Sequence, residues 1–141
     1  MSGIVVVGVD GSATARKAAE AARDLATGIG AILHVVAAFD GDHPGLGSGS
    51  GNWLVPDADR AEQVARTVAD TLGGDFKITY AAAPGRPADA LIREAIRKEA
   101  RIIVVGNRRM RGIGRVLGSV ANSVAHNAPC DVYIANTYDA D

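Results

Sequence analysis

The chain has one cysteine, few aromatic residues and no long hydrophobic run. A lone Cys130 excludes an internal disulfide and a cysteine-based zinc site, and suggests a small buried apolar residue. Aromatic residues make up only 4% of the chain, so Val, Ile, Leu and Ala must build the core. No run is long enough to span a membrane, and Met1 leads into a predicted strand without a secretory signal. We therefore expect a cytoplasmic protein with no membrane partner.

The sequence also lacks a charge excess of either sign. Its 15 basic and 16 acidic residues give a formal net charge of −1. Without a broad positive field, the chain is not expected to bind nucleic acid. A length of 141 residues with 48% hydrophobic content fits a single domain over residues 1–141 with a sizeable core.

Two common nucleotide-binding motifs of enzymes are missing. Segment 106–119 contains no lysine, which rules out a Walker P-loop. The dinucleotide fingerprint begins at Gly112 and Gly114 but fails at its third glycine, where Leu117 stands. No Cys/His metal spacing occurs, and no nucleophile–His–acid set falls at one strand end. We therefore expect no catalytic residue and no metal site.

Apolar runs bounded by turn residues alternate with helical patterns along the whole chain. Ile4–Val9 is apolar without alternation, as in a strand buried on both faces of a parallel sheet. The pattern predicts an α/β fold: a single doubly wound domain with a five-stranded, mainly parallel sheet in the order 3-2-1-4-5 and helices on both faces. The predicted strands are Ile4–Val9, Ile32–Ala38, Phe76–Ala82, Arg101–Val105 and Asp131–Ala135.

Four helices are expected between these strands. Ser12 and Asp57 are predicted N-caps, Pro87 suits a first turn, and Gly28 and Gly30 are predicted to end the first helix. Pro129 is expected to stop the last one. The predicted buried faces are Ala18, Ala22, Leu25 and Ile29; Ala61, Val64, Val68 and Leu72; Leu91, Ile92, Ala95 and Ile96; and Leu117, Val120, Ala121 and Val124.

One segment, Asp40–Pro56, is rich in Gly and Ser and too long for a plain connector. It suits a lid or a linker, and a short tail over residues 137–141 ends the chain. Trp53 within this segment either anchors it to the body or stacks on a bound base.

Among the histidines, His34 lies in a buried strand and is expected to be a hydrogen-bonded core residue, and His126 falls in the last turn of a helix.

Ligands of open parallel sheets bind at the carboxyl ends of strands, where the strand order reverses. Two predicted loops lie there, Asp10–Ser12 and Gly106–Gly118. Asp10 has two interpretations. In the first it contacts a ligand, through a hydrogen bond to a ribose hydroxyl or by binding a metal-phosphate. In the second it only stabilises its own turn. Sequence alone does not separate them.

The segment Val105–Val120 reads VGNRRMRGIGRVLGSV, with glycines, arginines and a predicted helix start in one run. Free backbone N–H groups at a helix start next to glycines form an anion site, which the arginines would strengthen. The alternative is a solvated basic turn. We favour phosphate because the glycines and the helix start point to it independently of the arginines.

Three stretches together resemble the universal stress protein family: GVDGS, LHVV and VVGNRRMRGIGRVLGSVANSVAHNAPCDVYI. The resemblance covers residues 4–137. The family's nucleotide-binding pattern is Gly, two residues, Gly, nine residues, then Gly-[Ser/Thr]; Gly106 and Gly118-Ser119 match its ends. Arg109 replaces the second glycine, and eight residues instead of nine separate it from Gly118. Arg109 either obstructs phosphate or clamps it through its guanidinium.

The resemblance implies a site with the base near Val9 and Val35, the ribose near Asp10 and phosphates near the glycine loop. The implied ligand is an adenine nucleotide, with ATP first, AMP or cyclic AMP as alternatives, and Mg²⁺ as companion of a triphosphate. The expected nucleotide-binding residues are Gly8, Val9, Asp10, Ser12, Val35, Val105, Gly106, Asn107, Arg108, Arg109, Arg111, Gly112, Gly118, Ser119 and Val120.

The family resemblance also implies a homodimer joined through the C-terminal edge strand, with Val132 and Ile134 as interface residues. The function expected first is a stress-response sensor or regulator that is not an enzyme and acts on a protein partner still to be identified. Two alternatives stay open: a member that binds no nucleotide and acts only through protein contacts, and a slow ATP hydrolase or phosphotransferase.

Overall fold

A computed structural model describes residues 3–40, 57–73, 77–107 and 118–137. Within them a five-stranded sheet has the order β3-β2-β1-β4-β5, and every strand pairing is parallel. The predicted fold class and strand order are confirmed. The strands are β1 (Ile4–Val9), β2 (Ile32–Phe39), β3 (Ile78–Pro84), β4 (Ile102–Gly106) and β5 (Asp131–Ala135).

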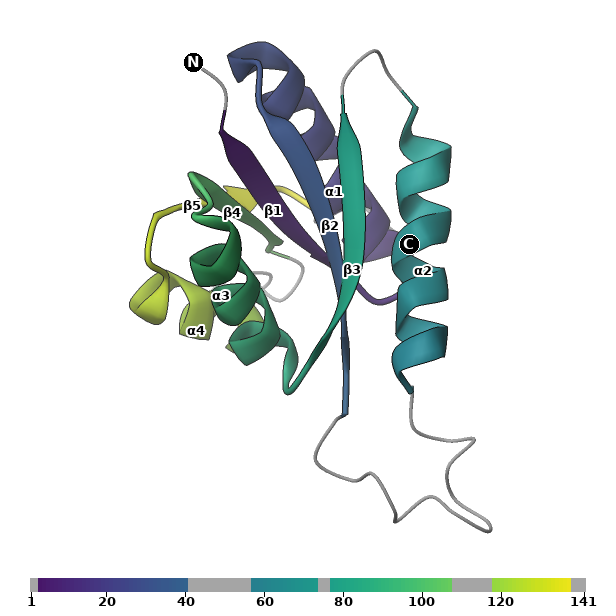
Figure 1. Cartoon of the computed structure of the whole chain (residues 1–141). Helices are drawn as coiled ribbons and strands as arrows, with labels where there is room; N and C mark the ends of the chain where they lie inside the picture. The colour runs from purple at the N-terminus through teal and green to yellow at the C-terminus, as the bar shows by residue number, and fades with distance from the viewer. Residues whose placement is uncertain (1–2, 41–56, 74–76, 108–117, 138–141) are drawn as a thin grey trace, which may run out of the picture.

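Two helices cover each face of the sheet (Figure 1). On one face α1 packs against β1 and β4, while α2 packs against β2 and β3. On the other face α3 packs mainly against β2 and β1, and α4 against β4 and β5. The core is therefore split by the sheet into two apolar layers. The helices are α1 (Ala13–Ile29), α2 (Ala58–Leu72), α3 (Pro87–Lys98) and α4 (Ser119–Asn127).

Local signals position the helix ends largely as predicted. The Ser12 hydroxyl accepts a hydrogen bond from the N–H of Ala15 at 3.1 Å, and the Asp57 carboxylate accepts one from Arg60 at 2.8 Å. Pro87 lies in the first turn of α3. Gly30 alone ends α1, because it takes a left-handed φ of 71°, whereas Gly28 lies inside the helix.

The prediction that Ile96 is buried is wrong. Its side chain is 60% exposed, while the carboxylate residue Glu94 on the same helix is 4% exposed. Ala88, Leu91 and Ala95 form a buried stripe at helical spacing, and Glu94 falls within that stripe while Ile96 falls outside it. The start of β3 also differs, since the strand begins at Ile78, and Phe76 lies outside the described residues.

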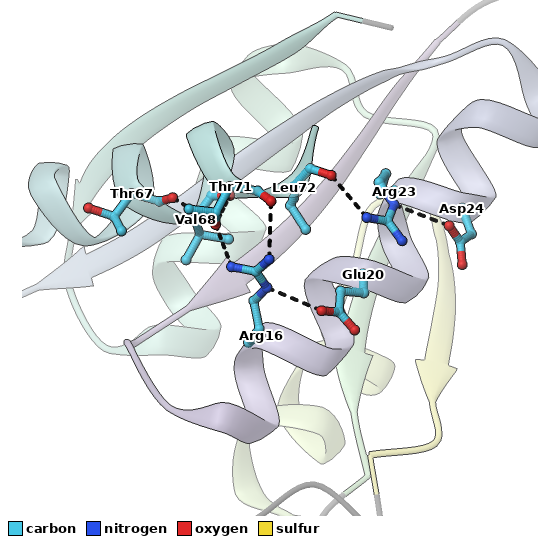
Figure 2. A network of polar contacts seen from close by, with 8 residues as sticks. All are labelled: Arg16, Glu20, Arg23, Asp24, Thr67, Val68, Thr71 and Leu72. Carbon is cyan, nitrogen blue, oxygen red and sulfur yellow. Dashed lines mark hydrogen bonds and ion pairs between the residues drawn. The ribbon is translucent and has the colours of Figure 1, made fainter. Parts of the chain in front are cut away.

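Two arginines of α1 hold the end of α2 (Figure 2). The Arg23 guanidinium donates to the backbone carbonyl of Leu72 at 3.0 Å. Arg16 donates to the carbonyl of Thr71 at 3.2 Å and also to its hydroxyl. Helix α2 has no basic residue of its own in its last turn, so α1 supplies the donors that its terminal carbonyls need.

Strand β5 lies at an edge of the sheet, as predicted. Ile134 is 40% exposed there, but Val132 is half-buried against the layer under α3 and α4. Tyr133, which the sequence interpretation left out, is 47% exposed.

Cys130 is half-buried beside the same layer, and burial together with the Asp131 carboxylate raises the pKa of its thiol.

Candidate functional site

A pocket of about 410 Å³ opens at the carboxyl ends of β1 and β4. The chain leaves β1 toward β2 on one side, and β4 lies on its other side, so this crevice is the point where strand order reverses. Its volume falls in the ordinary range of small-molecule sites. Three helices complete its walls: α1, α3 and α4.

Most of the predicted site residues that the structure describes come together in this pocket. The carboxyl ends of β1 and β4, the turn after β1 and the start of α4 supply them, although these segments are far apart in sequence. The predicted residues that line the pocket are Gly8, Val9, Asp10, Ser12, Val105, Gly106, Gly118, Ser119 and Val120. Arg108, Arg109, Arg111 and Gly112 lie outside the described residues, so their roles stay predictions.

Val35, predicted as a nucleotide-binding residue, does not line the pocket. Val35 is fully buried in the layer under α1 and α2. Successive side chains of a strand point to opposite faces, so its neighbour Val36 and then Ala38 reach the pocket from the α3 side. A strand buried on both faces has no polar alternation, and its sequence therefore does not reveal which residues face which layer.

The turn between β1 and α1 is fixed by its own hydrogen bonds. One oxygen of the Asp10 carboxylate accepts from the N–H of Ser12 at 2.9 Å. Gly11 between them has a φ of 88°, which favours glycine. The turn-stabilising role of Asp10 is thus present in the structure, and its exposed carboxylate also lines the pocket.

On the β4 side, a structural reason accounts for Gly106. A Cβ at this position would lie 2.9 Å from both Cγ2 and Oγ1 of Thr137. Thr137 is fully buried, and its N–H donates to the Asn107 side-chain oxygen at 2.8 Å. The Asn107 N–H donates in turn to the carbonyl of Ala135 at 3.1 Å. Asn107, predicted as a ligand residue, does not line the pocket and instead ties the end of β4 to the segment after β5.

Two helices begin at the pocket without an acidic residue in their first turns, α1 and α4. By contrast α2, which contributes nothing to the pocket lining, has Asp57 as its N-cap and Asp59 in its first turn. Acidic groups offset the partial positive charge of a helix start. Helix α4 has neither a first-turn acid nor a capping side chain, so its pocket end keeps a favourable field for an anion, whereas the Asp10 carboxylate lies beside the start of α1.

Sequence reasoning missed the pocket walls contributed by α1 and α3. These residues are small or apolar, and only a helix register fixed by packing shows that they face the crevice. Leu91 is the largest of them on α3, and a Cβ at Gly8 would lie 3.0 Å from its side chain. The missed lining residues are Thr14, Ala15, Ala18, Val36, Ala38, Pro87, Ala90, Leu91, Val104 and Ala121.

These features define the class of the protein: a doubly wound α/β domain with a small-molecule pocket at its topological switch point. Among the described residues, no three His, Cys, Asp or Glu side chains gather closely enough to hold a metal ion. Over the same part of the chain, no helix has both the length and the apolar character that crossing a membrane requires.

Comparison with known proteins identifies the family. Residues 1–136 match the universal stress protein family. A universal stress protein of Thermus aquaticus is 35% identical over 132 residues, covering 92% of this chain and 96% of that protein. One from Methanocaldococcus jannaschii is 30% identical over 138 residues, covering 92% and 79% respectively. The chain belongs to the universal stress protein family.

A solved structure adds a relative with a ligand. The crystal structure of a universal stress protein in complex with cAMP matches with a TM-score of 0.71 and 31% sequence identity. The match covers 96% of this chain and 97% of that one. The fold described above is therefore the fold of the family.

Proposed function

We propose that this chain binds an adenine nucleotide in the pocket between β1 and β4 and acts as a cytoplasmic, homodimeric regulator of a stress response. The observation that carries the proposal is the convergence of the start of α4, which has no first-turn acid, and the Asp10 carboxylate on one crevice of about 410 Å³. The relative crystallised with cAMP supports an adenine nucleotide as the ligand class.

The pocket lining offers two kinds of chemistry. Ala15, Ala18 and Ala38 give small apolar side chains, which suit a flat base. Gly118 and Ser119 begin α4, and their backbone N–H groups suit a phosphate. Asp10 suits a ribose hydroxyl, because one carboxylate oxygen satisfies the turn and a carboxylate can accept at both oxygens.

ATP is the first candidate ligand, with Mg²⁺ shielding its phosphates, and AMP and cyclic AMP are alternatives. Among the described residues, those that line the pocket include one carboxylate, Asp10, and no histidine, cysteine or lysine. This set supports binding in preference to hydrolysis, because general acid–base catalysis needs a group positioned to move a proton. We therefore propose a nucleotide-responsive binding protein.

Chromatography of the nucleotide released from denatured, freshly purified protein, followed by calorimetric titration with ATP and cyclic AMP, tests the proposal. We expect a bound or titratable adenine nucleotide. Asp10→Asn keeps an oxygen for the Ser12 N–H but removes the charge, and should weaken ATP binding about tenfold, the loss of one charge-assisted hydrogen bond. Asp70→Asn, on the exposed face of α2, is the matched control and should leave affinity unchanged.

Absence of released nucleotide together with absence of heat from both ligands would refute nucleotide binding. Conversion of ATP to ADP during the titration would contradict the non-enzymatic proposal instead. Equal weakening by Asp10→Asn and Asp70→Asn would contradict the assignment of Asp10 to the ribose.

A further inference from the structure

A buried polar pair lies between β2 and α3. His34 of β2 is 2% exposed and Glu94 of α3 is 4% exposed. The His34 Nε2 atom lies 2.9 Å from a carboxylate oxygen of Glu94, and its Nδ1 atom lies 2.6 Å from the hydroxyl of Thr79 on β3. The pair therefore ties α3 to two adjacent strands through one imidazole ring.

The contacts of the ring define its hydrogen positions. A carboxylate only accepts hydrogen bonds, so His34 Nε2 carries the hydrogen, and the Nδ1 of a neutral ring accepts from Thr79. Burial lowers the pKa of His34 although the Glu94 hydrogen bond acts to raise it. Burial alone would raise the pKa of Glu94, but hydrogen bonds from Arg97 and His34 outweigh it and lower this pKa. The arrangement suits a neutral imidazole beside a charged carboxylate.

This pair lies directly beneath the pocket. Val36 follows His34 on the same face of β2, and Leu91 precedes Glu94 by about one turn of α3. Both Val36 and Leu91 line the pocket. The buried hydrogen bond between His34 and Glu94 therefore fixes the distance between α3 and β2. The same distance separates the two pocket walls that these elements form.

We propose that His34 and Glu94 are positioning residues of this pocket, and that proton uptake by His34 loosens α3 and weakens the binding of its ligand. The ligand part of the inference rests on the proposed nucleotide function. Neither side chain lines the pocket, so both act through the position of α3.

Charge and hydration determine the direction of the effect. Within the described part of the chain, the charged groups that act on the ring come from α3: Glu94 favours its protonation, whereas Lys98 and Arg97 oppose it. At the register position of the ring, β1 and β3 present the uncharged Val6 and Thr79. An imidazolium at this site has little contact with water, and hydrating it requires α3 to separate from β2.

The test combines hydrogen exchange on α3 in the ligand-free protein with calorimetry of cyclic AMP binding, each from about pH 7.5 to about pH 5.5. In the unsubstituted chain, α3 amide protection and cyclic AMP affinity should both fall with acidity, the affinity by roughly 5- to 10-fold, at the low end of couplings between sites. His34→Gln should flatten both profiles. Glu94→Gln keeps an acceptor for the ring but removes the charge that favours protonation, so both profiles should move to lower pH.

His126→Gln is the matched control, because His126 lies exposed in the last turn of α4, and both profiles should stay as in the unsubstituted chain. If no nucleotide binds at about pH 7.5, the proposed function fails while the exchange profile of α3 still decides the inference. Exchange on α3 that shows the same dependence on pH in the unsubstituted chain and in Glu94→Gln would overturn it. So would cyclic AMP affinity that falls equally in the unsubstituted chain and in His34→Gln. If His34→Gln fails to fold, the shift in Glu94→Gln alone decides.

Discussion

At the scale of single residues, Gly106 shows how a glycine in a family pattern can have a reason unrelated to ligand. The buried Thr137 side chain occupies the space that a Cβ would fill, with two atoms 2.9 Å away. Contacts this short are not tolerated without movement of the threonine or the strand end. The glycine therefore preserves the packing of the segment after β5 and keeps the pocket edge free of a side chain.

Gly106→Ala should lower the free energy of unfolding by about 1–3 kcal/mol, the usual cost of overpacking a filled site. Thr137→Ala removes both close atoms and leaves only the Thr137 Cβ, 3.5 Å away. The double variant should therefore lose less stability than the sum of the two single variants. Urea denaturation of all four proteins measures this coupling, and additive losses would show that Thr137 is not the cause.

At the scale of elements, α2 depends on α1 for hydrogen-bond donors to the backbone carbonyls of its last turn. The guanidinium groups of Arg16 and Arg23 reach across to the carbonyls of Thr71 and Leu72 (Figure 2). Arg16 also pairs with Glu20 on its own helix at 3.3 Å. Each arginine thus serves the packing of two helices on one face of the sheet.

Arg23→Met keeps the apolar stem but removes the donor to Leu72, and should lower stability by about 1 kcal/mol, the net value of one such hydrogen bond. Hydrogen exchange should also become faster in the last turn of α2. Arg66→Met is the comparison, because Arg66 pairs with Asp70 at 3.8 Å on an exposed surface and should matter little. A similar loss in both variants would show that charge, and not the capping contact, is responsible.

At the scale of the whole molecule, stability should depend on pH through the buried pair. The folded pKa of His34 is lowered from its ordinary value of 6.5, so the unfolded chain takes up this proton first as pH falls. Below 4.5 the lowered pKa of Glu94 acts in the same direction. The free energy of unfolding should therefore decrease on acidification from about pH 6.5, by at most about 1.4 kcal/mol per pH unit for the histidine.

Urea denaturation at several pH values measures this dependence. His34→Gln should flatten the curve between about pH 6.5 and about pH 5, where only the histidine of the pair titrates in the unfolded chain. A gain in stability on acidification through this range would mean that the fold raises the histidine pKa, contrary to the direction given above.

Assembly is the second question at this scale. The edge strand β5 exposes Tyr133 and Ile134, and we propose that a second copy pairs with it. Ile134→Lys should raise the dimer dissociation constant by about tenfold or more, equivalent to ~1.4 kcal/mol. Ile96→Lys, on the outer surface of α3, is an equally drastic control that should leave assembly intact. Light scattering across a concentration series measures both, and a monomeric parent chain at all concentrations would contradict the proposal.

Much of the fold was predictable from local signals. The apolar runs of the strands, the caps at Ser12 and Asp57 and the helix start at Pro87 need no distant partner to be understood. The alternation of strands and helices then restricts the topology to a doubly wound sheet. Strand ends such as Asp10 were predictable for the same reason, because parallel strands bring their carboxyl ends to one edge.

Other features depend on contacts that sequence reasoning did not see. The burial of Glu94 depends on its partner His34, which lies on a strand 60 positions away. Val35 and Val36 are both valines, so only the packing of helices on the two faces decides which one reaches the pocket. The hydrogen bond that the Asn107 side chain accepts likewise depends on Thr137, which follows β5.

The pocket draws its walls from residues between Gly8 and Ala121, and thus from most of the chain's length. Any small molecule that binds there recognises only a completely folded chain and is released when that chain unfolds. Its concentration consequently adds to the stability of the folded form by mass action. Proteases act on opened chains, so the lifetime of the protein in a cell would rise and fall with the supply of its ligand. The amount of protein present would then itself record how much ligand has been available.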